Sequence, residues 1–208
     1  KKKVCTLIHP TEIPEVLFDY DAFIKNSNKK IVNIGYWLRK LNSIFRIPIA
    51  KNNTYNKIRL IPYSASRPLE MIDELVKKER SMYNIEIEQK YMENTITKSC
   101  LSNDEYDLLL SQNIIFLDLY DSSANNAIIE CIARTTPLLV NPLPAVVEYL
   151  GKEYPFYYDS LEEAAEKAED LNLVKQAHEY LRDCEIREKL SQKHFRESFK
   201  ETEIYRSL

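Results

Sequence analysis

Glycine is scarce in this chain of 208 residues, which contains only Gly35 and Gly151. Average usage would give about 14 glycines in a chain of this length. The P-loop, the glycine-rich dinucleotide loop and the Gly-x-Ser-x-Gly nucleophile turn each require glycines at a fixed local spacing. Because the two glycines stand far apart, the sequence excludes all of these motifs. The shortage also argues against an all-β sandwich or barrel, whose hairpins and bulges use glycine.

The chain also lacks an excess of basic charge, paired cysteines and long apolar runs. It has 29 Lys and Arg against 32 Asp and Glu, whereas a nucleic-acid-binding domain usually shows a basic excess. The four cysteines include no Cys-x-x-Cys pair, so neither a zinc site nor a disulfide framework is indicated. There is no apolar run of about 18 residues and no signal-peptide core at the start. We therefore expect a cytoplasmic protein without a membrane span, a nucleic-acid partner or a metal site.

Short apolar runs alternate with segments of helical periodicity through most of the chain. The alternation predicts an α/β fold, a Rossmann-like parallel sheet with helices on both faces and a helical C-terminus. The predicted strands are 31–34, 57–62, 91–100, 113–119, 137–140 and 155–158. The predicted helices are 37–47, 67–83, one that begins at Ser102, 127–133, 144–150 and 161–171, followed by polar helical sequence to residue 208.

Small polar residues follow the apolar run 113–119, where ligands of open α/β sheets bind. They are Asp121, Ser122, Ser123, Asn125 and Asn126, and they lead into a helix. The start of a helix offers free N–H groups and the positive end of a dipole, which suit a phosphate. The sequence therefore predicts a phosphate site here that needs no glycine-rich loop.

Glu130 stands in an otherwise apolar part of the same predicted helix, seven residues beyond Ser123. At the helical rise it lies roughly 10 Å along the axis from the helix start, which is similar to the span from a diphosphate to the ribose of the same nucleotide. A carboxylate accepts hydrogen bonds from ribose hydroxyls, as in the dinucleotide folds. The alternative is a surface glutamate that happens to follow Ile128 and Ile129.

Two segments of the sequence carry a family resemblance. The run SSANNAIIECIARTTPLLVNPLPAVVEYLG places Glu130, Thr136-Pro137 and Glu148 in the order of a Glu, a Thr-Pro step and a later Glu. The run KKIVNIGYWLRK places Gly35 and Arg39 just after a strand. Together they resemble the donor-binding domain of retaining GT-B glycosyltransferases, the group with a Glu-(seven residues)-Glu motif.

The resemblance implies the C-terminal half of a GT-B fold, which binds a UDP- or GDP-linked sugar and transfers the glycosyl group without a metal or other cofactor. It implies that residues 1–28 are an interdomain connector and residues 29–180 the donor-binding domain. Residues 181–208 are then a helix that packs on an N-terminal domain absent from this chain, where a glycan or other acceptor binds. The residues that it assigns to the donor are Gly35, Arg39, Ser122, Ser123, Asn125, Asn126 and Glu130.

The sequence departs from the family pattern at the first glutamate of the motif, where Ser122 stands. Asp121 is adjacent and is the candidate catalytic carboxylate in its place. Ser123 and Asn125 stand among the residues that replace the loop glycines. Two other functions stay open, namely a non-catalytic glycosyltransferase-like interaction module and a doubly wound binding domain related by fold alone.

Several other side chains have a structural interpretation. Trp37 is expected in the core, and His178 and His194 are expected to face solvent from polar helices. Arg59 and Arg67 flank the end of the second predicted strand, where a basic residue facing a diphosphate is an alternative to a structural role.

Overall fold

The computed structural model describes residues 4–49, 55–61, 69–122 and 125–207. At its centre is a five-stranded, fully parallel sheet in the order β3-β2-β1-β4-β5. The register places Val32 of β1 opposite Ile58 of β2 and Ile115 of β4. The strands are β1 (Lys30–Ile34), β2 (Asn56–Leu60), β3 (Thr95–Lys98), β4 (Ile114–Leu117) and β5 (Leu138–Val140). The α/β, Rossmann-like prediction is confirmed.

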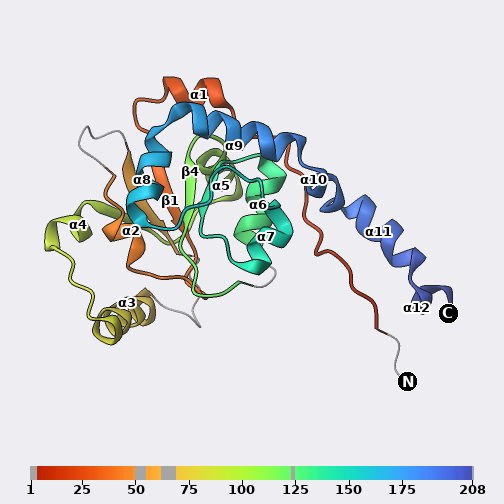
Figure 1. Ribbon diagram of the computed structural model, residues 1–208, viewed down its shortest axis with the longest axis horizontal. Helices are drawn as coiled ribbons and strands as arrows, with labels where there is room; N and C mark the ends of the chain where they lie inside the picture. Colours follow the sequence, from red (N-terminus) through yellow and green to blue (C-terminus); the bar gives the residue numbers. More distant parts are fainter. Residues whose placement is uncertain (1–3, 50–54, 62–68, 123–124, 208) are drawn as a thin grey trace.

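Helices cover both faces of this sheet, with α2 and α8 on one side and α5, α6 and α7 on the other (Figure 1). The helices before α7 are α1 (Tyr20–Lys25), α2 (Ser43–Arg46), α3 (Leu69–Tyr83), α4 (Gln89–Glu93), α5 (Asn103–Ser111) and α6 (Asn126–Arg134). The later ones are α7 (Pro144–Leu150), α8 (Leu161–Glu169), α9 (Leu171–Asp183), α10 (Glu185–Lys189), α11 (Gln192–Glu201) and α12 (Glu203–Arg206). No helix among the described residues combines the length and apolarity needed to cross a membrane.

The central strands are buried on both faces, as their unbroken apolar sequences require. Every residue of β4 and β5 is buried. The buried amide of Asn33 is paired, since its Nδ2 donates to the Phe116 carbonyl at 3.0 Å. Tyr158 belongs to this core and stacks on Phe116 with ring centroids 5.7 Å apart.

The predicted helix over 37–47 is wrong, because only α2 at its end is helical. Leu38 has a left-handed φ of 58°, and the Lys40 N–H donates to the Asp118 carbonyl at 2.8 Å. Backbone groups of this segment thus bond to the residues that follow β4, and its own turns are limited to isolated bonds such as that from the Ser43 N–H to the Lys40 carbonyl at 3.2 Å. Trp37, predicted to lie in the core, is consequently 72% exposed.

Three smaller predictions also differ from the structure. The segment 155–158 is not a strand, because its pairing with the sheet is a single bridge between Val140 and Tyr157. The predicted strand over 91–100 is shorter than expected, because β3 covers only Thr95–Lys98 and residues 91–93 belong to helix α4, which has no fully buried residue to mark it as a helix. His178 does not face solvent, because its Nδ1 lies 2.9 Å from the Thr135 carbonyl oxygen and its ring packs 5.2 Å from that of Phe18.

The N-terminal and C-terminal segments lie together beyond the sheet. Residues before α1 are largely extended, and the Thr11 N–H donates to the Leu190 carbonyl at 2.8 Å. Helices α11 and α12 extend away from the sheet beside this N-terminal segment (Figure 1), and neither contains a buried residue.

Candidate functional site

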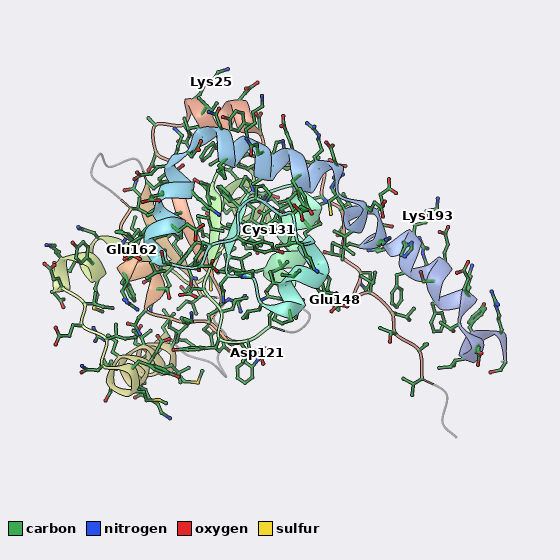
Figure 2. All side chains as sticks on the ribbon, in the orientation of Figure 1. Lys25, Asp121, Cys131, Glu148, Glu162 and Lys193 are labelled. Atoms are coloured by element: carbon green, nitrogen blue, oxygen red, sulfur yellow. The ribbon has the colours of Figure 1, made fainter. Side chains whose placement is uncertain are left out.

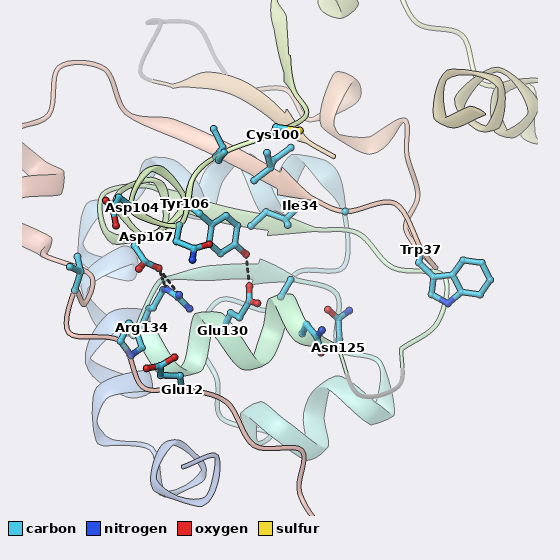
Figure 3. A pocket seen from close by; sticks show the side chains of 18 of the residues that line it. Glu12, Ile34, Trp37, Cys100, Asp104, Tyr106, Asp107, Asn125, Glu130 and Arg134 are labelled. Carbon is cyan, nitrogen blue, oxygen red and sulfur yellow. Dashed lines mark hydrogen bonds and ion pairs between the residues drawn. The ribbon is translucent and has the colours of Figure 1, made fainter. Parts of the chain in front are cut away.

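A pocket of about 1280 Å³ opens between the carboxyl ends of β1 and β4. In the strand order, the chain leaves β1 toward β2 on one side, while β4 and β5 lie on the other. Loops at such a switch point diverge and leave a crevice, which is where open α/β sheets bind ligands. Gly35 and Arg39 after β1, and Ser122, Asn125 and Glu130 after β4, all line this pocket. Figure 3 labels Asn125 and Glu130 among the lining residues.

The loop after β1 is attached firmly to the residues after β4. The Tyr120 N–H donates to the Leu38 carbonyl at 3.0 Å. The buried Asp118 carboxylate is 2.8 Å from Lys40 Nζ, and its second oxygen accepts from Ser43 Oγ at 2.5 Å. A further buried carboxylate, Glu79 of α3, accepts from the backbone N–H of Leu41 at 3.1 Å. These contacts fix the position of Arg39 within the pocket.

Arg39 lies between the end of β1 and the start of α6. Its Nη1 donates to the Trp37 carbonyl at 2.6 Å and its Nη2 to Asn125 Oδ1 at 3.2 Å. Its Nε is buried and has no hydrogen-bond partner among the described residues. Burial lowers the pKa of the guanidinium below its ordinary value. Such a group gains most from an anionic ligand, because a phosphate would supply the missing acceptor.

Gly35 makes this placement of Arg39 possible. Its φ of +80° is left-handed, and a Cβ built on it would lie 3.2 Å from Arg39 Cζ. Glycine is the residue that adopts such a φ at no steric cost. Gly35 therefore leaves the space that the Arg39 guanidinium occupies beside the pocket.

The start of α6 faces the same pocket. Asn125 is the N-cap in extended conformation, but its side chain makes no hydrogen bond to the helix. It bonds to Arg39, as described above, and therefore does not cap the first N–H groups of α6, which a helix start leaves without partners inside the helix. Asn126 is exposed and lines the pocket with Ser122. Ser123 lies outside the described residues.

Glu130 lines the pocket from α6 and accepts a hydrogen bond from the hydroxyl of Tyr106 on α5 (Figure 3). The next turn of α6 carries Arg134, whose guanidinium donates twice to Asp107 Oδ1, at 2.5 Å from Nη2 and 3.0 Å from Nε. Sequence reasoning missed Tyr106, Asp107 and Arg134. The helix predicted to begin at Ser102 is α5, which carries Tyr106 and Asp107, but the sequence did not show which face α5 turns to α6.

Acidic side chains form the outer rim of the pocket. Glu12 and Glu15 belong to residues 12–16, which border the pocket from the N-terminal segment, and Asp104 borders it from α5. The Phe18 N–H donates to the Arg134 carbonyl at 2.8 Å and so fixes that segment to the end of α6. Within the part of the chain that the structure describes, no group of three His, Cys, Asp or Glu residues is placed to hold a metal ion.

Asp121, the candidate catalytic carboxylate, is exposed, and its Oδ1 accepts from the Ser122 N–H at 2.8 Å. It is not among the residues that line the pocket, and it lies at the lower edge of the molecule in Figure 2. Arg59 pairs with Asp73 at 2.8 Å in a structural contact, and Arg67 lies outside the described residues. The catalytic role of Asp121 and the diphosphate contacts considered for Arg59 and Arg67 stay predictions.

No protein-family model and no curated relative matches this sequence. Solved structures do match. An α,α-trehalose-phosphate synthase (UDP-forming) from Burkholderia xenovorans, in complex with glucose-6-phosphate, superposes with a TM-score of 0.59 at 13% identity over 86% of this chain. TarM superposes with a TM-score of 0.56 at 12% identity over 93% of this chain. The fold is that of a GT-B glycosyltransferase domain.

The chain spans less than half of each of those proteins. The chain covers 44% of the Burkholderia synthase and 37% of TarM. It covers 46% of an E. coli trehalose-6-phosphate structure bound with UDP-2-fluoro glucose, at a TM-score of 0.57 and 11% identity. At such identities the likeness establishes the fold, and function has to be argued from the pocket.

Proposed function

We propose that this chain is the donor-binding half of a glycosyltransferase and binds a nucleoside-diphosphate sugar, UDP- or GDP-linked, in the pocket between β1 and β4. The observation that carries the proposal is the pocket itself, where Gly35, Arg39, Asn125 and Glu130 meet at the switch point of a GT-B-type sheet. A matched E. coli structure holds UDP-2-fluoro glucose, which supports this class of ligand.

In this proposal the diphosphate lies between Arg39 and the start of α6. Arg39 offers a buried guanidinium with an unused Nε, and α6 offers its first N–H groups. Negative charge grows on the leaving diphosphate as the glycosidic bond breaks, so donors that are already oriented stabilise the transition state more than the ground state. The proposed transfer is metal-independent and retains the anomeric configuration, and Glu130 accepts from the ribose hydroxyls.

The acceptor is proposed to bind a further domain outside residues 1–208, with residues 1–28 as the connector to it. The share of the matched proteins that this chain leaves uncovered is large enough for such a domain. Helices α11 and α12, which have no buried residue, are proposed to pack against it.

Thermal unfolding with UDP, GDP, UDP-glucose and GDP-mannose tests donor binding. A ligand at about 100 times its Kd stabilises by about 2.7 kcal/mol, which for a chain of this size raises Tm by about 5–11 °C. Glu130→Gln removes a charged acceptor and is expected to weaken binding by about 10-fold or more. Glu162→Gln, on the exposed first turn of α8, is the matched control and should keep the whole shift. No Tm shift of the wild type with any of the four ligands would reject the proposal.

A second candidate is a glycosyltransferase-like interaction module without catalytic activity. Ser122 at the place of a glutamate and the exposed Asp121 outside the pocket lining favour it. The same ligand panel separates the two, because a module of this kind has no reason to respond to a nucleotide.

A further inference from the structure

We propose that Tyr106 is a positioning residue that orients the Glu130 carboxylate and thereby sets how strongly the pocket distinguishes a ribonucleotide from a deoxyribonucleotide. The inference rests on the proposed nucleotide site and adds to it a residue from a different helix. It concerns α5, which the family resemblance does not connect with the donor.

The first support is the hydrogen bond itself. Tyr106 and Glu130 both line the pocket, and the Tyr106 hydroxyl donates to Glu130 Oε2. A glutamate side chain has three rotatable torsions, so a carboxylate without such a bond samples several orientations. With Oε2 fixed by Tyr106, the carboxylate plane is set and Oε1 has no other hydrogen-bond partner from the described residues. Oε1 is then the acceptor for a ligand hydroxyl.

The second support is that the donor keeps its proton. Burial raises the pKa of Tyr106 above its ordinary value, and the adjacent Glu130 charge raises it further. The hydroxyl therefore remains a donor across the range in which proteins are stable.

The third support is the arrangement of the nearby cation. Arg134 lies one turn beyond Glu130 on the same face of α6, with its guanidinium 5.7 Å from the centre of the Tyr106 ring. Left free, a guanidinium at this spacing would pair with Glu130 and occupy the oxygen meant for a ligand. Asp107 prevents this pairing, because its Oδ1 accepts hydrogen bonds from both Nε and Nη2 of Arg134. Helix α5 thus supplies the Tyr106 hydroxyl that bonds to Glu130 and the Asp107 carboxylate that pairs with Arg134.

The consequence is a selective acceptor for one ligand hydroxyl. A site built to hydrogen-bond a hydroxyl rejects the analogue that lacks it, since its own polar group is then left without a partner. Tyr106→Phe keeps the ring but releases the carboxylate. We therefore expect the variant to bind both nucleotides and to distinguish them less.

Calorimetry on the full chain tests this with two pairs of nucleotides, UDP against 2′-deoxy-UDP and GDP against 2′-deoxy-GDP. In the wild type we expect the ribonucleotide of the preferred base to bind about 10-fold or more tightly. In Tyr106→Phe we expect that ratio of affinities to fall to about threefold. In the double variant Tyr106→Phe/Glu130→Gln we expect the same ratio as in Glu130→Gln alone, because Tyr106 acts only through Glu130. Tyr149→Phe, a partly buried tyrosine of α7 outside the pocket, is the matched control and should leave the ratio unchanged.

A purely structural role for Tyr106 would lower Tm and leave the ratio intact, and that result overturns the inference while the proposed function stands. Absence of binding of all four nucleotides to the wild type overturns both. Asp107→Asn gives a second test that leaves Tyr106 in place, because it releases Arg134 toward Glu130. We expect Asp107→Asn to reduce the ratio of affinities as well. An unchanged ratio in both Tyr106→Phe and Asp107→Asn would show that α5 does not orient Glu130.

Discussion

At the scale of single residues, Gly35 and Arg39 depend on each other. The left-handed φ of Gly35 turns the chain at the end of β1, and the absence of a Cβ leaves room for the guanidinium. The scarcity of glycine therefore does not exclude a phosphate site, although it excludes the glycine-rich loops. In the proposed site one glycine suffices, because a side chain, and not a run of backbone N–H groups, would meet the ligand from β1.

Gly35→Ala is expected to reduce both stability and ligand binding. A left-handed φ costs an L-residue about 1–2 kcal/mol, and the new Cβ would displace Arg39. Gly151→Ala is the matched control, because its φ is +79° but its Cβ would meet Tyr180, outside the pocket. Urea unfolding should show a loss in both variants, and calorimetry with the bound nucleotide should show weaker binding in Gly35→Ala alone. Equal affinity of the two variants would argue against the role given to Gly35.

At the scale of elements, local sequence signals succeeded where the local chain supplies its own partners. Helix α5 begins where predicted, because two hydrogen bonds cap its start. Ser102 Oγ accepts from the Glu105 N–H at 3.2 Å, and Glu105 Oε2 accepts from the Ser102 N–H at 2.8 Å. The apolar run of β4 likewise predicted a central strand. The helix prediction for the loop after β1 was wrong for the opposite reason, because the backbone partners of this loop, Asp118 and Tyr120, lie far along the chain.

Lys57 of β2 is a partly buried amine that attaches this strand to the end of α2. Its Nζ donates to the carbonyls of Phe45 and Ile47, at 3.1 and 2.6 Å, where α2 ends. Burial lowers the pKa of the amine to about 8 from 10.5. The charged form is therefore disfavoured in the folded state, and between about pH 8 and 10.5 the unfolded chain binds more protons at this residue. Stability contributed by this group must rise with pH through that window.

Lys57→Met tests this sign. The variant lacks the titrating amine, so its free energy of unfolding should lack this rise, whatever the other groups do in common. We expect the stability of the wild type, relative to Lys57→Met, to increase between pH 7 and pH 10. Urea unfolding of both proteins at several pH values measures the difference. A constant or falling difference would contradict the assigned burial of Lys57.

At the scale of the whole molecule, the C-terminal helices divide into a part that stabilises the domain and a part that does not. Leu190 is fully buried and its carbonyl accepts from Thr11, and Arg187 Nε donates to the Ala133 carbonyl at 3.1 Å. Beyond it, Phe195, Phe199 and Tyr205 pack mainly on one another in α11 and α12.

A chain that ends at Ser191 is therefore expected to unfold within about 3 °C of the full chain, because loss of less than about 1 kcal/mol shifts Tm by about 2–4 °C at this size. A chain that ends at Asp183 loses Leu190 and Arg187 and should unfold clearly earlier. Calorimetric scans of the three lengths make the comparison. A large loss on removal of residues 192–208 would show that α11 stabilises this domain and is not reserved for another one.

The sequence by itself determined the α/β class, the order of most elements and the region of the pocket. Periodicity reports which face of a short segment is buried, and the carboxyl ends of parallel strands must meet at one edge of a sheet, so Gly35, Arg39 and Glu130 were expected there together. The tertiary structure alone decided that Tyr106, Asp107 and Arg134 join them, that residues 12–16 border the pocket, and that Trp37 is exposed. Those outcomes depend on which residues distant in the chain satisfy a hydrogen bond or an ion pair, and a local pattern contains no information on such partners.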